Sequence, residues 1–190
     1  MAKHKLGIIV GSNRRESINR KLAAALAKLG ADRFEAQFIA IDELPMYNQD
    51  LENPLPGPVA RFKTELASSD ALLFVTPEHS RSIPAVLKNA IDWGARPYGK
   101  TSWPGKPAAI IGTSSGAIST AIAQQHLRAV LGNLGLHVAG GEAYIAFRPD
   151  LIDAQGDVTD DGVRKFLKNF IDQFAAFAAR FTSPKAAAAA

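Results

Sequence analysis

The sequence predicts an α/β domain built on a doubly wound, five-stranded parallel sheet in the order 2-1-3-4-5, with helices on both faces. Two observations predict this fold class. Short apolar runs alternate along the chain with segments of helical periodicity, as expected where right-handed crossovers connect parallel strands. The runs are apolar at successive positions, which is typical of strands buried on both faces. At 190 residues, the chain has the length of one domain.

The first half of the chain supplies three of the strands. Residues 6–10 form an apolar run that ends at Gly11, and residues 17–29 carry an apolar helical stripe that stops at Gly30. Residues 34–41 alternate between apolar and polar and predict the second strand. A long polar loop, a helix opened by a proline, and the third buried strand follow at residues 42–58, 59–66 and 71–76.

The second half continues the same alternation. We expect a helix at residues 84–93, a loop at 94–104 and a strand at 108–112. A helix at 120–134, a strand within 136–147 and a closing helix at 160–181 follow. Five phenylalanines at helical spacing predict a stripe packed on the sheet: Phe166, Phe170, Phe174, Phe177 and Phe181. The domain therefore spans residues 1–182, and residues 183–190 form a low-complexity tail.

Composition and charge exclude several classes of function. Because the chain has no cysteine, it cannot use a thiolate nucleophile, an iron–sulfur cluster, a Cys-ligated zinc or a disulfide scaffold. A net charge of +4 suits small anions or phosphates and falls short of a nucleic-acid-binding surface. No stretch resembles a signal peptide or a membrane span. We therefore expect a cytoplasmic protein that binds no metal, nucleic acid or membrane.

Two common motifs occur in the sequence, but the residues around them do not fit the sites that these motifs usually form. Residues 94–101 match G-x-x-x-x-G-K-[ST], but a helical pattern precedes them, whereas a P-loop connects a strand to a helix. Residues 112–116 match G-x-S-x-G, the nucleophile elbow of hydrolases. That arrangement needs an acid and then a histidine downstream, yet no Asp or Glu lies between Ser114 and His137, the last histidine. A P-loop nucleotidase and a serine hydrolase are both disfavoured.

The loop after the first strand has the composition of a phosphate site. Residues 11–19 combine a glycine, short polar side chains and two arginines at the N-terminus of the first helix. A helix N-terminus offers unpaired N–H groups and a partial positive charge. Since the loop lacks G-x-G-x-x-G, a mononucleotide is favoured over a dinucleotide. In the alternative interpretation, Ser17 is only the N-cap, and Arg14 and Arg15 are surface residues.

Two more polar loops follow the third and fourth strands. In residues 77–84, Pro77 and Pro84 keep both ends extended, so that backbone groups can face the edge of a flavin ring. In residues 113–116, small polar residues allow a planar ring to approach and can stabilise negative charge near N1 of a reduced flavin. In a doubly wound sheet these loops meet at the ligand-binding edge. The alternative for His79 is an exposed loop residue.

The motifs in the first two loops are Gly11-Ser-x-Arg14-x-x-Ser17-x-Asn19 and Pro77-Glu-His-Ser-x-Ser82-Ile-Pro84-x-x-Leu87-Lys-Asn-Ala-Ile-Asp-Trp93. They resemble those of the NADPH-dependent FMN reductase family, the flavodoxin-like quinone, chromate and azo reductases. The similarity spans most of residues 5–146. The family usually has Tyr in place of His79, Asn in place of Ser80 and a hydrophobic residue in place of Asn13, so the departures concern side-chain contacts to the ring.

The resemblance implies one FMN per subunit, electrons drawn from NADPH or NADH, and a homodimer or homotetramer. It assigns the FMN phosphate to Ser12, Arg14, Ser17, Ile18 and Asn19. It places Pro77, Glu78, His79 and Ser80 along the isoalloxazine ring, with Ser114 and Ser115 at the other edge.

The implied chemistry requires no catalytic acid or nucleophile from the protein. Hydride passes from NAD(P)H to FMN, and two electrons then pass to a small-molecule acceptor such as a quinone, chromate, azo compound, ferric complex or free flavin, in a ping-pong sequence. Arg81 is a candidate contact for the NADPH 2′-phosphate or an anionic substrate, with a solvated loop arginine as the alternative. Two other functions stay open: a flavodoxin-like electron carrier, although such carriers are typically acidic, and a non-redox nucleotide-binding module.

Overall fold

The strands form one parallel sheet, and its order confirms the sequence prediction. The computed structural model describes residues 3–182, so the expected tail at 183–190 lies outside the described residues. The order is β2-β1-β3-β4-β5, and β6 also pairs with β4. The strands are β1 (His4–Val10), β2 (Phe34–Phe38), β3 (Ala71–Val75), β4 (Pro107–Ser114), β5 (His137–Val138) and β6 (Tyr144–Ala146).

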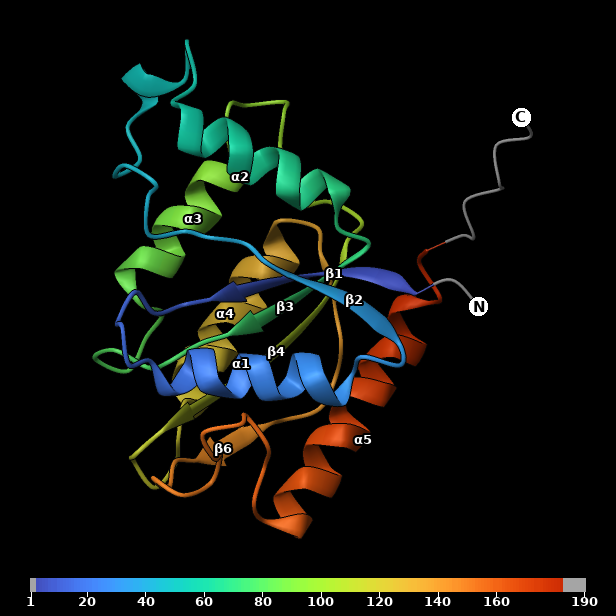
Figure 1. Cartoon of the computed structure of the whole chain (residues 1–190). Helices are drawn as coiled ribbons and strands as arrows, with labels where there is room; N and C mark the ends of the chain where they lie inside the picture. The colour runs from blue at the N-terminus through green and yellow to red at the C-terminus, as the bar shows by residue number, and fades with distance from the viewer. Residues whose placement is uncertain (1–2, 183–190) are drawn as a thin grey trace, which may run out of the picture.

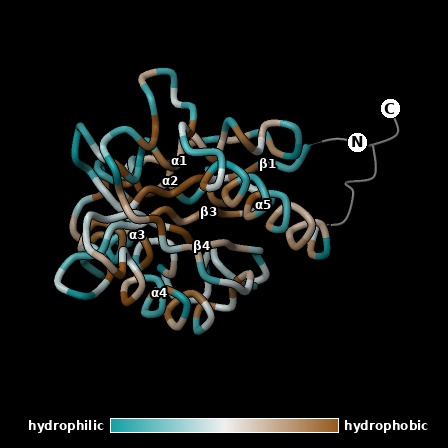
Figure 2. Tube along the Cα trace, turned by 90° about the horizontal axis from the view of Figure 1, so that it is seen from below, coloured by the Kyte–Doolittle hydropathy of each residue, from teal (hydrophilic) through white to brown (hydrophobic). Residues whose placement is uncertain are grey.

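Helices cover both faces of this sheet, as Figure 1 shows. One face carries α1 (Ile18–Leu29) and α5 (Asp161–Ala178), and the other carries α2 (Gly57–Ser68), α3 (Ala85–Ala95) and α4 (Ala121–Asn133). A separate apolar cluster lies under each helix layer. In Figure 2, β3 and β4 run through the hydrophobic centre, and hydrophilic segments lie mostly at the periphery. Within residues 3–182, no helix has the length and apolarity to cross a bilayer.

The ends of the helices follow their sequence signals. The Ser17 side chain caps α1 by accepting a hydrogen bond from the Arg20 N–H at 3.2 Å. Gly30 follows the last residue of that helix, and its N–H donates to the Leu26 carbonyl. Asp160 caps α5 by accepting from the Val163 N–H at 2.9 Å. The capping residues Ser17 and Asp160 lie just outside α1 and α5, so each of these helices begins one residue later than predicted. Helix α2, in contrast, is longer than the predicted residues 59–66.

The fifth strand differs from its prediction, because two short strands replace one segment within residues 136–147. His137 of β5 pairs with the start of β4, and Tyr144 of β6 pairs with Gly112 near its end. Between the two strands the chain leaves the ladder. The Arg128 guanidinium there donates to the carbonyls of Ala139 and Gly141. These bonds satisfy backbone groups that a continuous ladder would have paired.

Strand β2 is shorter than the alternating pattern predicted, since it ends at Phe38 and not at residue 41. Ile39 still donates to the Ile8 carbonyl at 2.9 Å, after which the chain leaves the sheet. Ile39 and Ile41 are nevertheless buried in the cluster beneath α2 and α3. The alternation did not predict burial within the strand, because Ala36 and Phe38 are exposed. The buried residues after Phe34 are Ile39 and Ile41, which lie beyond the strand.

The phenylalanine stripe of α5 is only partly buried, so that prediction was wrong in detail. Phe174 is 2% exposed, whereas Phe166 and Phe181 are 43% and 39% exposed. The residues that face the sheet mostly follow a phenylalanine by one position, namely Leu167, Ile171, Ala175 and Ala178, and they are buried. The aromatic stripe is therefore rotated to the flank of the buried face. There Phe181 stacks on His137 with ring centroids 4.2 Å apart.

A polar network holds the long loop between β2 and α2 against the C-terminus of α3. Glu52 accepts hydrogen bonds from the Arg96 Nε and the Tyr47 hydroxyl, each at 2.8 Å. The Tyr47 N–H also donates to the Asn89 side chain at 2.7 Å. A short 3₁₀ turn, η1 (Gln49–Leu51), lies inside this loop. The loop therefore has a fixed conformation although its sequence is rich in turn-forming residues.

We expect this network to make stability depend on acid pH. The hydrogen bonds from Arg96 and then Tyr47 lower the pKa of Glu52 below its ordinary value. Because the pKa of Glu52 is lower in the folded state, its ionised form stabilises the protein at pH values above the unfolded pKa of about 4.3. This stabilisation is lost as the pH falls through the folded pKa. Wild type should melt above Glu52→Gln at pH 7, and the difference should shrink toward pH 3. A difference that stays constant with pH, measured by thermal melts, would contradict this assignment.

Candidate active site

Three loops meet at the carboxyl edge of the sheet, at the left of Figure 1. They follow β1, β3 and β4 and lead to the N-termini of α1, α3 and α4. The register aligns the strand ends, because Val10 pairs with Val75 and Val75 pairs with Ile111. Between β1 and β3 the winding of the sheet reverses, which is where doubly wound folds bind ligands. The structure therefore brings together the three loops that the sequence singled out.

The first loop is organised by two serines. The Arg14 N–H donates to the Ser12 hydroxyl at 3.4 Å, which folds residues 12–14 into a tight turn. Ser17 is buried, and its hydroxyl accepts from the Arg20 N–H, so Ser17 is the N-cap of α1. Ser12 remains partly exposed at the tip of the turn.

The same loop offers unpaired positive charge at the start of α1. Arg14 and Arg15 are exposed, and neither has an ion-pair partner within residues 3–182. No acidic residue lies in the first turn of α1, and the nearby Glu16 is 3.8 Å from the Lys21 ammonium. An anion at this helix end would meet N–H groups and free guanidinium groups. These features fit a phosphate monoester.

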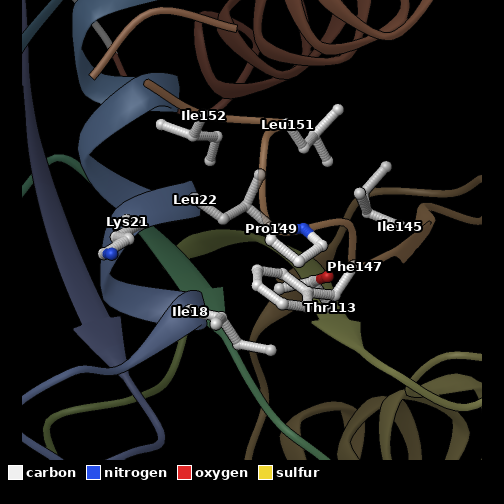
Figure 3. A pocket seen from close by; sticks show the side chains of 9 residues that line it. All are labelled: Ile18, Lys21, Leu22, Thr113, Ile145, Phe147, Pro149, Leu151 and Ile152. Carbon is white, nitrogen blue, oxygen red and sulfur yellow. The ribbon is translucent and has the colours of Figure 1, made fainter. Parts of the chain in front are cut away.

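Ile18 and Asn19 occupy different surroundings from the loop that precedes them. Ile18 turns its side chain into an apolar cavity beside β4 (Figure 3). Asn19 is 1% exposed and pairs with the backbone of Thr113, donating to its carbonyl at 2.9 Å and accepting from its N–H at 3.0 Å. The Asn19 amide thus links the first loop to the end of β4. In the sequence this residue was assigned to the phosphate, and its structural role was missed.

The second loop closes into a two-residue hairpin turn. The His79 N–H donates to the Ser82 carbonyl at 3.1 Å, and the Ser82 N–H donates to the His79 carbonyl at 2.9 Å. Ser80 and Arg81 at its tip have φ values of 47° and 61°. Both central residues of a type I′ turn need positive φ, which asparagine and glycine adopt most readily. Serine and arginine there indicate backbone strain of a kind that clusters at functional sites.

Glu78 anchors this hairpin to α4. Its side chain is only 6% exposed, and its carboxylate accepts hydrogen bonds from the N–H groups of Ile122 and Ala123 at 2.9 and 3.0 Å. The same carboxylate pairs with the Arg81 guanidinium at 3.0 Å. Thr120, at the N-cap position of α4, makes no side-chain cap. Glu78 therefore caps α4 from another loop, and its carboxylate faces the helix and not the proposed ring edge.

We expect Glu78→Ala to destabilise the protein by about 1–2 kcal/mol, because it leaves the first N–H groups of α4 without an acceptor. Glu78→Gln keeps an oxygen that can accept from those N–H groups and should lose less than half as much. Exposed Glu142 provides the matched control, Glu142→Ala, which should change the melting temperature little. Equal losses for Glu78→Ala and Glu142→Ala in thermal melts would show that the cap is unimportant.

The third loop begins where β4 lies unusually close to β3. A Cβ atom on Gly112 would lie 2.1 Å from the Thr76 carbonyl oxygen, so only glycine fits there. After it, the Ser114 hydroxyl donates to the Ser119 carbonyl at 3.1 Å and accepts from the Gly116 N–H at 3.2 Å. Ser115 is exposed at the tip. Ser114 thus shapes a small polar turn next to the hairpin.

One hydrogen-bonded pair beside these loops was missed by sequence reasoning. The Ser82 hydroxyl lies 3.0 Å from Nδ1 of His126, which projects from α4. The two residues are 44 positions apart, so no local pattern connects them. Together with Glu78, this pair fixes the hairpin to α4 at two points.

The chain matches known proteins along nearly its whole length. Residues 4–150 match the family described as NADPH-dependent FMN reductase. A 2-hydroxy-1,4-benzoquinone reductase from a Burkholderia species is 48% identical over 174 residues, covering 91% of this chain and 95% of the relative. An NAD(P)H-dependent FMN reductase from Pseudomonas aeruginosa is 39% identical over 162 residues, covering 84% and 87%.

Among solved structures, FerB from Paracoccus denitrificans, a flavoenzyme NAD(P)H:(acceptor) oxidoreductase, superposes with a TM-score of 0.91. It is 44% identical, and the superposition covers 94% of this chain and 98% of FerB. These matches confirm the resemblance that the two loop motifs indicated. The chain belongs to the NADPH-dependent FMN reductase family, and it is an FMN-dependent oxidoreductase that draws its electrons from NAD(P)H.

Proposed function

We propose that this chain is an NAD(P)H:quinone oxidoreductase that binds FMN across the three loops at the carboxyl edge of the sheet. One observation carries the site: unpaired arginines stand at the N-terminus of α1, at the point where the winding reverses and two further loops converge. The Burkholderia relative, named as a benzoquinone reductase, supports a quinone as the acceptor. The proposed domain spans residues 1–182.

At the phosphate end, the proposed contacts come from the Ser12 hydroxyl, the Arg14 guanidinium and the free N–H groups of α1. A doubly charged phosphate is stabilised by a guanidinium and by a helix N-terminus. Ser17 and Asn19 are proposed to act by shaping the loop, since the side chains of both already make internal hydrogen bonds. Ile18 contributes its backbone.

At the ring end, the backbone of residues 77–80 faces the proposed ring from the hairpin, and Ser114 and Ser115 face it from the third loop. Bound FMN supplies two-electron transfer from NAD(P)H to an acceptor. The residues of the chain orient the ring and keep both partners at one face. Two hydrogen-bonded contacts keep these loops from moving apart. Glu78 of the second loop binds the N-terminus of α4, and Asn19 of α1 binds the end of β4. Such fixed positioning supplies much of the rate when no side chain reacts.

Arg81 is proposed to contact the 2′-phosphate of NADPH. It is 68% exposed and shares one guanidinium nitrogen with Glu78, so its other donors remain available. Arg81→Ala should raise the KM for NADPH about tenfold, since charged hydrogen bonds contribute about 1.5–3 kcal/mol, and should leave the KM for NADH unchanged. Steady-state kinetics with both donors give the comparison. If the KM values for NADPH and NADH change equally, Arg81 does not contact the 2′-phosphate.

Two measurements on the purified protein test the proposed function. The FMN-loaded protein should oxidise NAD(P)H with 1,4-benzoquinone and no other protein present. An electron carrier would bind FMN but oxidise NAD(P)H only with a partner reductase, and a non-redox module would show no flavin absorbance after addition of FMN. We also propose a homodimer or homotetramer in the cytoplasm, which light scattering and cell fractionation test.

A further inference from the structure

A pocket opens at the carboxyl edge of the sheet, between the ends of β1 and β2. Its volume is about 160 Å³, and three of the side chains that line it are buried and apolar: Val10, Ile39 and Ile41. A cavity of about 150 Å³ is large enough to hold one benzene ring. Ser12, a proposed contact of the FMN phosphate, also lines the pocket. The pocket therefore has room for one ring and adjoins the proposed phosphate site.

Two charged side chains in the wall of this pocket lack ion-pair partners. Arg20, on α1, and Asp42, after β2, are both exposed, and neither forms an ion pair within residues 3–182. The Arg20 guanidinium lies over the ring of Phe38, 5.9 Å from its centroid, and that ring is 39% exposed. The wall thus presents a cation, an aromatic face and a carboxylate to any occupant.

These three groups match the three parts of an adenosine phosphate. A guanidinium binds phosphate through charged hydrogen bonds and also stacks on flat rings. An aromatic side chain stacks on a nucleobase. The Asp42 carboxylate repels a lone anion, but it accepts hydrogen bonds from ribose hydroxyls. A nucleotide therefore fits this wall better than a free phosphate ion does.

We propose that this pocket holds the adenosine monophosphate half of FAD, so that the chain binds FAD as well as FMN. The inference rests on the proposed function, because the flavin half of FAD occupies the three loops as FMN does. The second phosphate meets Arg20, the adenine stacks against Phe38, and the ribose hydroxyls donate to Asp42. The first loop lacks the G-x-G-x-x-G backbone that holds a pyrophosphate, and the Arg20 side chain takes over that part.

Calorimetric titration of the flavin-free protein with FMN and with FAD measures the two affinities. FAD should bind about 3- to 30-fold more tightly, because stacking and a charged hydrogen bond are added while ordering the adenosine offsets part of the gain. Isoleucine δ1 methyl groups labelled with ¹³C show where the second half binds. Replacing FMN by FAD should shift Ile39 and Ile41, which line the pocket, and leave Ile83 in the second loop unchanged.

Variants of the wall separate the two halves of FAD. Arg20→Ala should lower FAD affinity about tenfold and FMN affinity less than about threefold. Phe38→Ala should lower only FAD affinity, by about fivefold or more, and Phe38→Tyr should keep it. Lys21→Ala is the matched control, because Lys21 is the next residue on α1, is exposed, carries the same charge and does not line the pocket. It should change the two affinities equally.

The affinity for FMN is the internal reference, because a variant that still binds FMN is folded. Three results would each overturn the proposal: equal or weaker binding of FAD by wild type, no methyl shifts at Ile39 and Ile41, or equal losses of FMN and FAD affinity in Arg20→Ala. If the protein binds neither flavin, the proposed function itself is wrong. If it binds FMN and discriminates against FAD, only this inference is wrong.

Discussion

Arg14→Ala should weaken FMN binding roughly 10- to 100-fold, because a hydrogen bond between two charged groups contributes about 1.5–3 kcal/mol. Arg14 is exposed and has no carboxylate partner within residues 3–182, so its removal breaks no internal ion pair. The melting temperature of the FMN-free protein should therefore stay unchanged. Quenching of FMN fluorescence during titration measures the affinity.

The neighbouring arginine provides the matched control. Arg15 is equally exposed and carries the same charge at the same helix end, but the phosphate motif assigns it no contact. Arg15→Ala should reduce FMN affinity by less than about fivefold, as expected for a screened charge without a direct hydrogen bond. If both variants lose the same FMN affinity, then the loop attracts the phosphate by its general positive charge and Arg14 makes no specific contact. If neither variant loses FMN affinity, the proposal that this loop binds the phosphate is wrong.

Asn19→Ala should lower the free energy of unfolding by about 2–4 kcal/mol, because it leaves the buried N–H and carbonyl of Thr113 without partners. For a chain of this size the melting temperature should fall by roughly 5–15 °C. The loss should appear in the FMN-free protein, since the two hydrogen bonds link α1 to β4. Thermal melts of the FMN-free protein measure it.

Asn13→Ala is the control for that variant, since Asn13 is an exposed amide in the same loop and makes no hydrogen bond within residues 3–182. Its melting temperature should match wild type. If Asn19→Ala retains wild-type stability and loses only FMN affinity, then Asn19 is a phosphate ligand, as the family resemblance implied, and not a structural link.

The sheet order and the convergence of the three loops could be predicted from the sequence because both depend on local patterns. Apolar runs gave the buried strands, and the loops that follow them meet at one edge whatever the side chains do. Ser17 was recognisable as an N-cap for the same reason, since capping involves residues three positions apart. The division of the fifth strand was not predicted. There Arg128 donates to backbone carbonyls 11 and 13 positions away, which no local pattern indicates.

The roles of Glu78 and Asn19 could not be predicted, because their partners are far along the chain. Glu78 caps a helix 44 positions away, and Asn19 pairs with backbone 94 positions away. Both residues stand in motifs that point to a ligand, so a sequence analysis assigns them to the ligand. In the structure they hold together the loops that the ligand would contact. Only the tertiary contacts distinguish these two kinds of role.

The hairpin turn at Ser80 and Arg81 restricts how this protein can be redesigned. Both positions have a left-handed backbone conformation, which valine, isoleucine and threonine rarely adopt. These residues at either position would therefore distort the turn, whatever contact they make with a substrate. A mutant library that aims to change the range of acceptors should therefore vary His79, whose side chain is exposed and whose backbone has no such restriction. At position 80, asparagine and glycine are the replacements compatible with an intact loop.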